Sequence, residues 1–329
     1  MPGWLKQRDY SRIFIVTDNN IRGHCLPVFF QKSGLSPATP LVQASAGERY
    51  KTLSTCEIIW QAMFDARLDR KTLVVNLGGG VIGDMGGFCA STFKRGVDFI
   101  QIPTTLLAMT DAAIGGKLGI DFQGIKNAVG VFRNPAAVFV DPVFLKTLPS
   151  RELHSGFAEV IKHALIGDPG LWGKIRAIPA GQLTTGEMDW LELLRASIAV
   201  KVRVVAEDPL EKGLRALLNF GHTIGHAIES YFLDTSDPLT HGEAVAIGMI
   251  CEAPMAELSD IILLHFPHQP IPEDAFPALW ELMLHDKKNA SGTVRIAVPD
   301  TEPFSMRLLE LTQDEMGQRL RYYNGLMPG

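Results

Sequence analysis

The stretch TLVVNLGGGVIGDMGGF, residues 72–88, decides the fold. An apolar, β-branched segment runs into three consecutive glycines and then into a helical pattern over residues 84–94. Gly78, Gly80 and Gly83 therefore have the G-x-G-x-x-G spacing directly after a predicted strand and before a predicted helix. A pyrophosphate must approach the N–H groups of a helix N-terminus closely, and a Cβ would block it. The stretch predicts a dinucleotide-binding turn; a tight turn that binds nothing is the alternative.

Similar apolar segments flank this turn. They are short, rich in β-branched residues and alternate with helical periodicity, which is the βαβ pattern of a parallel sheet. Residues 56–68 place their apolar side chains on one face, as a helix that covers a sheet does. The further predicted strands are IFIVTD (13–18), LVQAS (41–45), VDFIQIP (97–103) and AVFVDP (137–142).

Helical periodicity dominates after Pro149. A chain of 329 residues, 46% of them hydrophobic, is too long for one compact core. We expect an α/β, Rossmann-like domain over residues 1–147 and an all-α domain over residues 148–329. The predicted helices of the second domain cover residues 152–166, 188–206, 215–231 and 243–258, with one late strand at TVRIAVP, 293–299.

The composition argues against several classes of function. The net charge is −5 and no segment is dense in Lys and Arg, so no surface is suited to a nucleic acid backbone. No segment has the length of a signal peptide or of a membrane span, which predicts a cytoplasmic protein. Cys25, Cys56, Cys89 and Cys251 are scattered without CxxC spacing, so we expect buried, reduced thiols.

One acidic residue and three histidines are candidates for a metal site. LNFGHTIGHAIES places His222 and His226 four residues apart, LTHGEAVAIGM supplies His241 at a predicted helix start, and GFAEVIKHAL puts Glu159 inside an apolar helix. A catalytic Zn²⁺ site needs three protein ligands and one open position, so Glu159 and two histidines would suffice. The spacing does not say which two. The third would be available for acid–base work, and ordinary core histidines are the alternative.

Cationic and amide side chains recur beside glycine or on the same predicted helices. Arg215 and Asn219 fall on the same helical stripe as His222 and His226. A polar stripe is costly to bury unless it lines a site, and fixed cations suit a substrate with phosphate and carboxylate groups. The other candidates are Lys117, Lys126, Asn127, Lys201, Lys287 and Lys288.

The chain resembles the 3-dehydroquinate synthase family of the sugar phosphate cyclase superfamily. The strings that carry the resemblance occur in order over residues 12–300. They are GGGVIGDMGGF, KRGVDFIQIPTTLLAMTDAAIGGK, IKNAVGVF, LPSRELHSGFAEVIKHAL, LNFGHTIGHAIE and HGEAVAIGM. The resemblance implies an NAD-binding domain, a helical domain, an active site in the cleft between them and, usually, a homodimer.

The resemblance also implies a role for each matching residue. Zn²⁺ or Co²⁺ would be held by Glu159, His222 and His241, which leaves His226 for proton transfer. Glu211, Lys162 and Lys117 would complete the catalytic set. The substrate would contact Arg95, from the partner subunit, and Lys117, Asn127, Lys201, Arg215, Asn219, His226 and one of Lys287 and Lys288. NAD would be held by Asp18, Asn20, Glu48, Lys51, Gly79, Gly80, Val81, Asp84, Thr104, Thr105, Asp111, Lys126, Phe144, Thr147, Leu148 and Glu152.

The reaction that the resemblance implies starts from 3-deoxy-D-arabino-heptulosonate 7-phosphate. Transient oxidation at C5 acidifies the adjacent C–H so that phosphate leaves, and re-reduction, ring opening and an internal aldol step give 3-dehydroquinate. NAD is not consumed. Two departures stand out: the chain begins close to its first strand, where family members carry extra strands, and Thr110, Ala113 and Ile114 replace an expected valine, serine and valine.

Three other functions remain as alternatives. A sister sugar phosphate cyclase would share NAD and metal but change the residues around the substrate. A polyol oxidoreductase of the glycerol dehydrogenase type would consume NAD⁺ and would not need so many anion ligands. A non-catalytic NAD-binding protein would not need the metal and proton-transfer positions, all of which are present.

Overall fold

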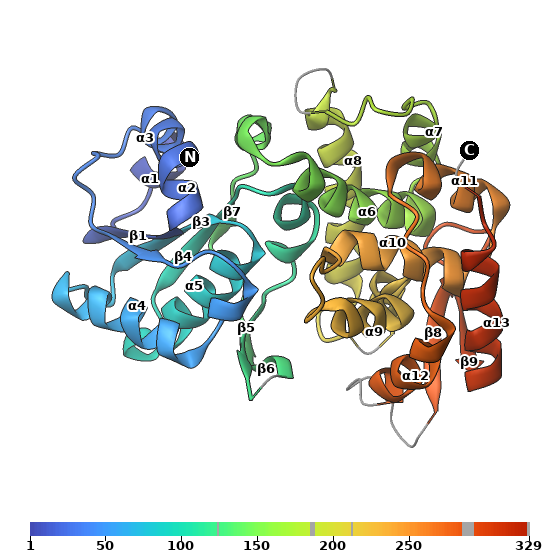
Figure 1. The fold of residues 1–329 in the computed structure, drawn as a ribbon. Helices are drawn as coiled ribbons and strands as arrows, with labels where there is room; N and C mark the ends of the chain where they lie inside the picture. Colours follow the sequence, from blue (N-terminus) through green and yellow to red (C-terminus); the bar gives the residue numbers. More distant parts are fainter. Residues whose placement is uncertain (124, 185–187, 212, 285–292, 328–329) are drawn as a thin grey trace. The chain divides into compact units, whose positions relative to one another are not determined.

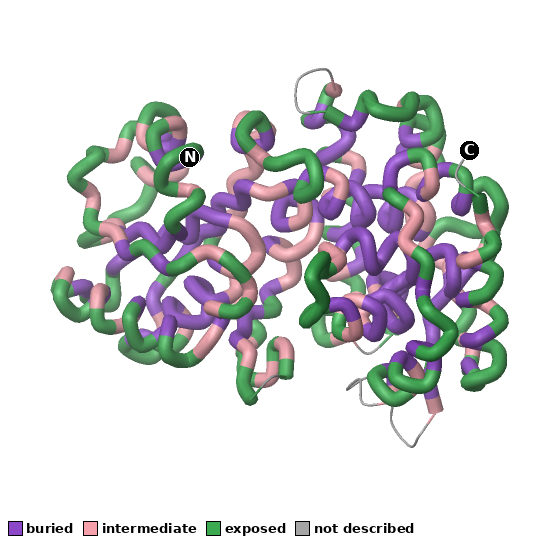
Figure 2. Tube along the Cα trace, viewed as in Figure 1, coloured by how far each residue is buried: buried purple, intermediate pink, exposed green. Residues whose placement is uncertain are grey.

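The computed structural model describes residues 1–123, 125–184, 188–211, 213–284 and 293–327. The chain divides into two compact units, Met1–Leu148 and Pro149–Gly329. Figure 1 shows the helices and strands of each unit, and Figure 2 shows that each has its own buried interior.

The first unit is built on a five-stranded parallel sheet with the order β2-β1-β3-β4-β7. The predicted parallel sheet is therefore confirmed, although the last strand is shorter than its apolar run. Every residue of β3 is buried, as expected for a central strand that is covered on both faces. The strands are β1 (Arg12–Asp18), β2 (Leu41–Ala44), β3 (Thr72–Gly78), β4 (Asp98–Pro103) and β7 (Ala137–Val138).

Helices α4 and α5 lie on one face of this sheet, and α2 and α3 on the other (Figure 1). Phe14, Val16 and Val74 join the core under α4 and α5, because alternate strand residues point to the same face. The helical segments are α1 (Pro2–Lys6), α2 (Asn19–His24), α3 (Leu26–Ser33), η1 (Glu48–Tyr50), α4 (Leu53–Asp65), α5 (Gly80–Thr92), η2 (Phe93–Arg95), η3 (Ala108–Ala112) and η4 (Pro142–Thr147).

An antiparallel hairpin of β5 (Lys117–Phe122) and β6 (Ile125–Phe132) also belongs to this unit, and the sequence did not predict it. Leu118 and Ile120 anchor β5 in the core beneath α5. None of the β6 residues is fully buried, so its sequence lacks the strong apolar alternation that marks a strand.

The second unit is mainly helical, as predicted, and includes a small antiparallel sheet of β8 and β9. The late strand prediction is confirmed, whereas β9 was missed. The elements are α6 (Ser150–Gly167), α7 (Pro169–Arg176), α8 (Trp190–Glu207), η5 (Leu214–Asn219), α9 (His222–Phe232), α10 (His241–Glu252), α11 (Ala256–His265), η6 (Glu273–Ala275), α12 (Phe276–Leu284), β8 (Val294–Pro299), β9 (Met306–Leu311) and α13 (Gln313–Asn324).

Glycines allow α6, α9 and α10 to pack at very short range. A Cβ on Gly242 would lie 2.0 Å from the carbonyl oxygen of Ser155, in α6. A Cβ on Gly248 would lie 2.0 Å from the carbonyl oxygen of Gly221, just before α9. Both distances are far below van der Waals contact, so the backbones meet only because these side chains are absent. This packing brings the starts of α9 and α10 close to α6.

Two predicted helices are in fact interrupted. Residues 215–231 form η5 and α9, because Gly221 adopts a left-handed φ of 78° between them. Arg215 and Asn219 therefore do not share one helical stripe with His222 and His226, and that prediction was wrong. Residues 243–258 are likewise divided, since α10 ends before Pro254, which has no N–H to continue the helix.

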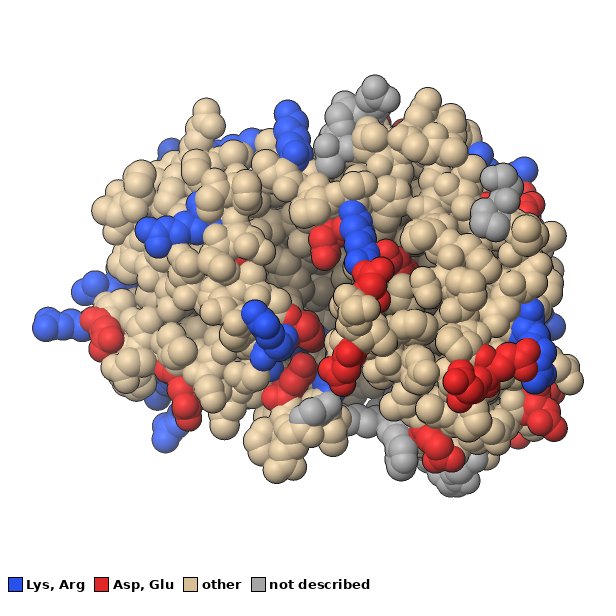
Figure 3. Space-filling view, in the orientation of Figure 1, with Lys and Arg blue, Asp and Glu red and all other residues tan. Residues whose placement is uncertain are grey.

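All four cysteines are buried and free, as predicted. Basic and acidic side chains are interspersed on the face of each unit drawn in Figure 3, so neither sign dominates that face. No described helix has the length and hydropathy that crossing a bilayer would need.

His265, at the end of α11, is a buried histidine of the second core. It is 6% exposed, and neither ring nitrogen has a hydrogen-bond partner among the described residues. Its ring lies edge-on to Phe157, with 5.4 Å between centroids. Burial, with a smaller contribution from His154, lowers the pKa of His265 from 6.5 to about 4. The folded protein therefore holds this ring neutral.

We expect His265 to make the fold sensitive to acid. As the pH falls from 6.5 toward 4, the unfolded chain gains a proton that the folded chain does not. The free energy of unfolding should fall over this window by on the order of 3 kcal/mol, and the effect should be absent above it. Urea unfolding at several pH values checks this. His265→Leu should flatten part of the slope, and an unchanged slope would contradict the prediction.

Candidate metal centre and nucleotide site

Three histidines meet at the starts of α9 and α10 in the second unit. His222 opens α9, His226 lies one turn later, and His241 opens α10. One ring nitrogen of each lies within 4.8 Å of those of the other two. The ring centroids are 5.1 to 5.7 Å apart. Such a group of imidazoles can hold a divalent metal ion.

Glu159 of α6 faces this cluster from a completely buried position. Its Oε1 lies 3.4 Å from Nε2 of His222 and 3.8 Å from Nε2 of His241. Neither oxygen accepts a well-formed hydrogen bond from a described residue, although the ammonium of Lys162 forms an ion pair with Oε2. A buried carboxylate with unsatisfied oxygens beside two imidazoles fits a metal ligand.

The outer nitrogens of two histidines are held in place. Nδ1 of His222 lies 3.0 Å from the carbonyl oxygen of Phe220, and Nδ1 of His241 lies 3.2 Å from Oε2 of Glu229. Partners of this kind fix the tautomer and turn Nε2 toward a metal. In both rings, Nε2 is the nitrogen that faces Glu159. Glu229 was not among the predicted site residues, although it follows His226 by three residues and so lies on the same helix face.

The local charges shift the three ionisable groups in different directions. Burial and the nearby Lys162 ammonium lower the pKa of His222 to about 3. Burial opposes a charge on His241, but Glu159 and Glu229 raise its pKa to about 9. Burial likewise disfavours the Glu159 carboxylate, yet Lys162 and the two histidines hold its pKa well below the usual range. Glu159 and His222 are thus shifted toward the deprotonated forms that metal ligands need, whereas His241 is shifted away from that form.

The remaining predicted residues of this unit lie on several elements. Lys162, 1% exposed, donates to the carbonyl oxygen of Leu218 at 2.8 Å. Asn219 Nδ2 donates to Oε1 of Glu211 at 3.2 Å, so two predicted residues are brought together.

The other predicted residues of this unit are placed as follows. Arg215 is buried and Lys201 lies on α8. Glu152 lies in the first turn of α6, and burial raises its pKa. Lys287 and Lys288 lie outside the described residues.

In the first unit, the glycine turn lies at the carboxyl end of the sheet. β2 is added to one side of β1 and β3 to the other, so the order in which strands are added to the sheet reverses between β1 and β3. This is the topological switch point of the sheet. Ligands of open α/β sheets bind outside the strand carboxyl ends at such a point. Asp18 ends β1, and Gly79 and Gly80 join β3 to α5. Three of the predicted NAD residues, Asp18, Gly79 and Gly80, therefore lie where the topology favours a nucleotide.

A side chain at either glycine of the turn would make a tight contact with a neighbouring side chain. A Cβ on Gly79 would lie 3.1 Å from Cγ2 of Thr105, and one on Gly80 would lie 3.3 Å from Cβ of Ala112. Gly79 also gives α5 no side-chain cap. The first N–H groups of α5 are thus suited to a phosphate, which supports the prediction of a dinucleotide turn.

Lys51 links three parts of the first unit. It is 4% exposed, and its Nζ donates to Oδ2 of Asp84 at 2.6 Å and to Oδ1 of Asn127 at 2.7 Å. Glu48 Oε1 lies 3.8 Å away. Burial raises the pKa of Asp84 to about 6 even though Lys51 opposes the shift. Two predicted NAD residues and one predicted substrate residue therefore meet at this amine.

The other predicted residues of the first unit are distributed around the sheet. Asp18 accepts hydrogen bonds from the N–H groups of Asn20 and Ile21 at 2.9 Å, so it also caps α2. The buried hydroxyl of Thr104 has no partner among the described residues. Burial raises the pKa of the Cys25 thiol, and the nearby Thr147 opposes that shift. Val81 lies on α5, Arg95 on η2, Asp111 on η3, Lys117 on β5, Lys126 on β6, Phe144 on η4, and Leu148 directly after η4.

Family comparison identifies both halves of the chain. The model of the 3-dehydroquinate synthase N-terminal domain matches residues 41–155, and that of the C-terminal domain matches residues 156–289. The chain belongs to the 3-dehydroquinate synthase family. A 3-dehydroquinate synthase of Parabacteroides distasonis is 40% identical over 310 residues, which cover 91% of this chain and 87% of the relative.

Two solved structures from sister enzymes of the family are also similar. The 2-epi-5-epi-valiolone synthase ValA of Streptomyces hygroscopicus, with NAD⁺ and Zn²⁺ bound, matches with a TM-score of 0.82 at 27% identity, over 98% of this chain and 93% of that chain. A 2-deoxy-scyllo-inosose synthase in complex with carbaglucose-6-phosphate, NAD⁺ and Co²⁺ matches with a TM-score of 0.80 at 25% identity, over 95% and 90%. The Parabacteroides distasonis relative, at 40% identity, is considerably more similar in sequence than either of these two structures.

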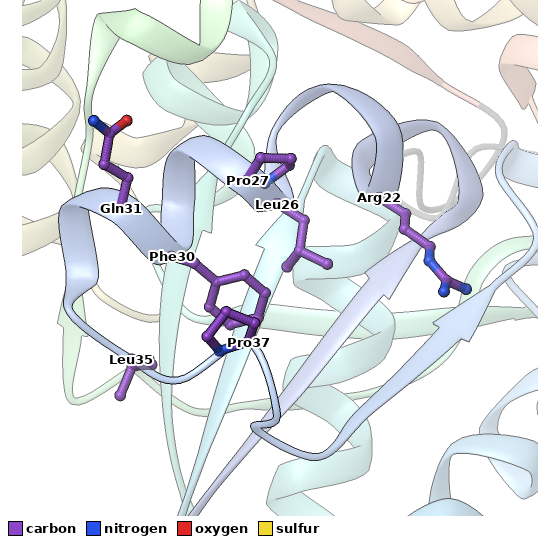
Figure 4. A pocket seen from close by; sticks show the side chains of 7 residues that line it. All are labelled: Arg22, Leu26, Pro27, Phe30, Gln31, Leu35 and Pro37. Carbon is purple, nitrogen blue, oxygen red and sulfur yellow. The ribbon is translucent and has the colours of Figure 1, made fainter.

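An apolar hollow of about 580 Å³ lies elsewhere in the first unit, beside α2, α3 and the following loop (Figure 4). None of the residues predicted for the family site lines it. Its lining consists of Arg22, Leu26, Pro27, Phe30, Gln31, Leu35 and Pro37.

Proposed function

We propose that this chain acts as a 3-dehydroquinate synthase, converting 3-deoxy-D-arabino-heptulosonate 7-phosphate to 3-dehydroquinate and phosphate. The observation that carries the proposal is the approach of Glu159 to the Nε2 atoms of His222 and His241, in a chain of this family. The reaction is a step of the shikimate pathway toward aromatic amino acids. We further propose a cytoplasmic homodimer.

NAD and a divalent ion, Zn²⁺ or Co²⁺, are the proposed cofactors, because structurally similar cyclases carry them. Bound NAD would supply a reversible hydride acceptor for C5, and a bound ion would supply a Lewis acid for the C5 oxygen. In the first unit, the α5 N-terminus would bind the pyrophosphate. In the second, Glu159, His222 and His241 would hold the ion.

Side chains of this chain would hold the substrate and move its protons. Lys117, Lys162, Lys201 and Arg215 would neutralise phosphate and carboxylate and so fix the geometry that each step needs. His226 belongs to the same histidine cluster, and the family resemblance assigns it proton transfer rather than metal binding. Glu211, within hydrogen-bond distance of Asn219, would act in a second proton transfer.

Incubation with the heptulosonate phosphate and catalytic NAD⁺ tests the proposal. The expected result is stoichiometric phosphate release without accumulation of NADH. Stoichiometric NADH would instead indicate a polyol dehydrogenase. Phosphate release from a hexose or heptulose phosphate, with none from the heptulosonate, would indicate a sister cyclase.

Arg215 provides a test of substrate recognition. It is 2% exposed, and Nη1 donates to the carbonyl oxygen of Pro209 at 2.8 Å. We expect Arg215→Ala to raise the KM for the phosphate substrate by about 10- to 100-fold, because a charge-assisted contact is lost. NAD affinity should hardly change. Arg215→Lys keeps the charge but loses the planar guanidinium group, so its KM for the phosphate substrate should lie between those of the wild-type protein and Arg215→Ala.

Steady-state kinetics with both compounds varied, and direct NAD titration, check the Arg215 prediction. Similar losses for substrate and NAD would contradict the assigned role and point to a general loss of structure.

A further inference from the structure

Helix α9 begins without a side-chain cap of its own. Its N-cap residue is Gly221, which has no side chain and a left-handed φ of 78°. The first N–H groups of a helix have no partner within it and need an outside acceptor when they are buried. His222, a proposed metal ligand, is the first residue of this helix. The group that holds this turn therefore also determines where the His222 backbone lies.

Glu252 supplies that acceptor from another helix. It is the last residue of α10 and is 1% exposed. Its Oε2 accepts from the N–H of Gly221 at 2.7 Å, and its Oε1 accepts from the N–H of Ile224 at 3.0 Å. These are the N-cap and N3 positions, which two separate side chains satisfy in a capping box. Here the single carboxylate of Glu252 accepts both hydrogen bonds, and its negative charge interacts favourably with the positive end of the helix dipole.

The end of α10 is itself held in place. Nη1 of Arg319, on α13, donates to the carbonyl oxygens of Cys251 at 2.9 Å and Glu252 at 2.8 Å. A cation is favourable at a helix C-terminus, where carbonyl groups lack partners. The other end of α10 starts with His241. Helix α10 thus carries the proposed ligand His241 at its start, and Glu252 at its end holds the first turn of α9, which carries the proposed ligand His222.

We propose that Glu252 is a positioning residue of the metal centre: by capping α9 from α10, it sets the distance and direction of His222 relative to His241 and Glu159. The inference rests on the proposed function, because it assumes that these three residues bind the ion. Glu252 accepts hydrogen bonds from the backbone on either side of His222, so we expect it to act through the position of His222.

Glu252→Gln is the sharpest variant. The side chain keeps its shape, but its NH₂ group must face one of two N–H donors, so one buried hydrogen bond is lost. We expect Zn²⁺ and Co²⁺ to bind about 10- to 100-fold more weakly, as when groups that orient metal ligands are removed. The visible spectrum of bound Co²⁺ should also change.

The matched control is Asp168→Ala. Asp168 caps α7 by accepting from the N–H of Leu171 at 2.9 Å, so this change also removes a carboxylate cap from the second unit. Metal affinity of the full-length protein is measured by competition with a chromophoric chelator, together with the Co²⁺ spectrum. NAD titration of the same samples reports on the first unit.

Weaker metal binding and an altered spectrum in Glu252→Gln, with wild-type values in Asp168→Ala, would support the inference. Wild-type metal affinity in Glu252→Gln, or equal losses in both variants, would overturn it while leaving the proposed function intact. Absence of metal binding by the wild-type protein would overturn both. If Glu252→Gln does not fold, Glu252→Asp, which withdraws the carboxylate by one methylene, is judged by the same criteria.

Discussion

His222→Ala is expected to strip the protein of its metal, whereas His226→Ala should keep the metal and lose turnover. His222 presents Nε2 to Glu159 while its Nδ1 faces a backbone carbonyl, so the ring is oriented as a ligand. Its loss should weaken metal binding by more than the roughly 10- to 100-fold typical of groups that only orient ligands. Loss of an acid–base group at His226 should lower kcat by about 10²- to 10⁴-fold.

Metal content after dialysis and steady-state kinetics separate the two effects. His24→Ala, at an exposed histidine that ends α2, is the matched control and should change neither quantity. Equal metal loss in His222→Ala and His226→Ala would refute the assignment of ligand and proton-transfer roles. It would indicate instead that all three histidines of the cluster bind the ion.

Lys51→Met should abolish NAD binding at micromolar protein and lower the free energy of unfolding by about 3–5 kcal/mol. The buried Lys51 amine donates to Oδ2 of Asp84 at 2.6 Å and to Oδ1 of Asn127 at 2.7 Å. The substitution removes both of these hydrogen bonds. The pKa of Asp84, about 6 with Lys51 present, should then rise, so that the side chain becomes protonated near neutral pH. A neutral Asp84 would no longer provide the carboxylate that the family resemblance assigns to NAD binding.

Fluorescence titration with NADH and thermal unfolding measure these changes. Lys71→Met is the control, since that exposed lysine lies 3.7 Å from the exposed Asp9 and should matter little. Adding Asp84→Asn to Lys51→Met should recover part of the stability, because no uncompensated carboxyl group then remains at this half-buried position. Unchanged NAD affinity in Lys51→Met would exclude the proposed role of this amine.

Strongly patterned elements could be predicted from the sequence. β3 is buried along its whole length, and a strand covered on both faces needs a continuous apolar run such as TLVVNL. The β5–β6 hairpin was missed because its outer strand has no fully buried face to impose a pattern. The break before α9 was missed because the glycine in a helical pattern can be tolerated within a helix, and its left-handed φ follows from tertiary packing.

The same contrast applies to the candidate site. Glu159 could be noticed because a carboxylate inside an apolar helix needs a partner or a function. His222 and His241 stood out through their motifs. Glu229 and Glu252, by contrast, are acidic residues on ordinary helices, and their roles depend on which backbone or ring lies opposite them in space. The spacing of Glu229 from His226 was a weak signal, but sequence spacing carries no information about a contact between helices such as that of Glu252.

The close approach of α6, α9 and α10 limits how this enzyme could be made more robust. Replacing glycine by alanine inside a helix usually adds about 0.5–1 kcal/mol of stability, so a thermostabilisation campaign would target such positions early. At Gly242 and Gly248 the added methyl would collide with a main-chain oxygen at 2.0 Å, and the helices would have to separate. A library should therefore hold both positions invariant and seek its gains on the outer helices.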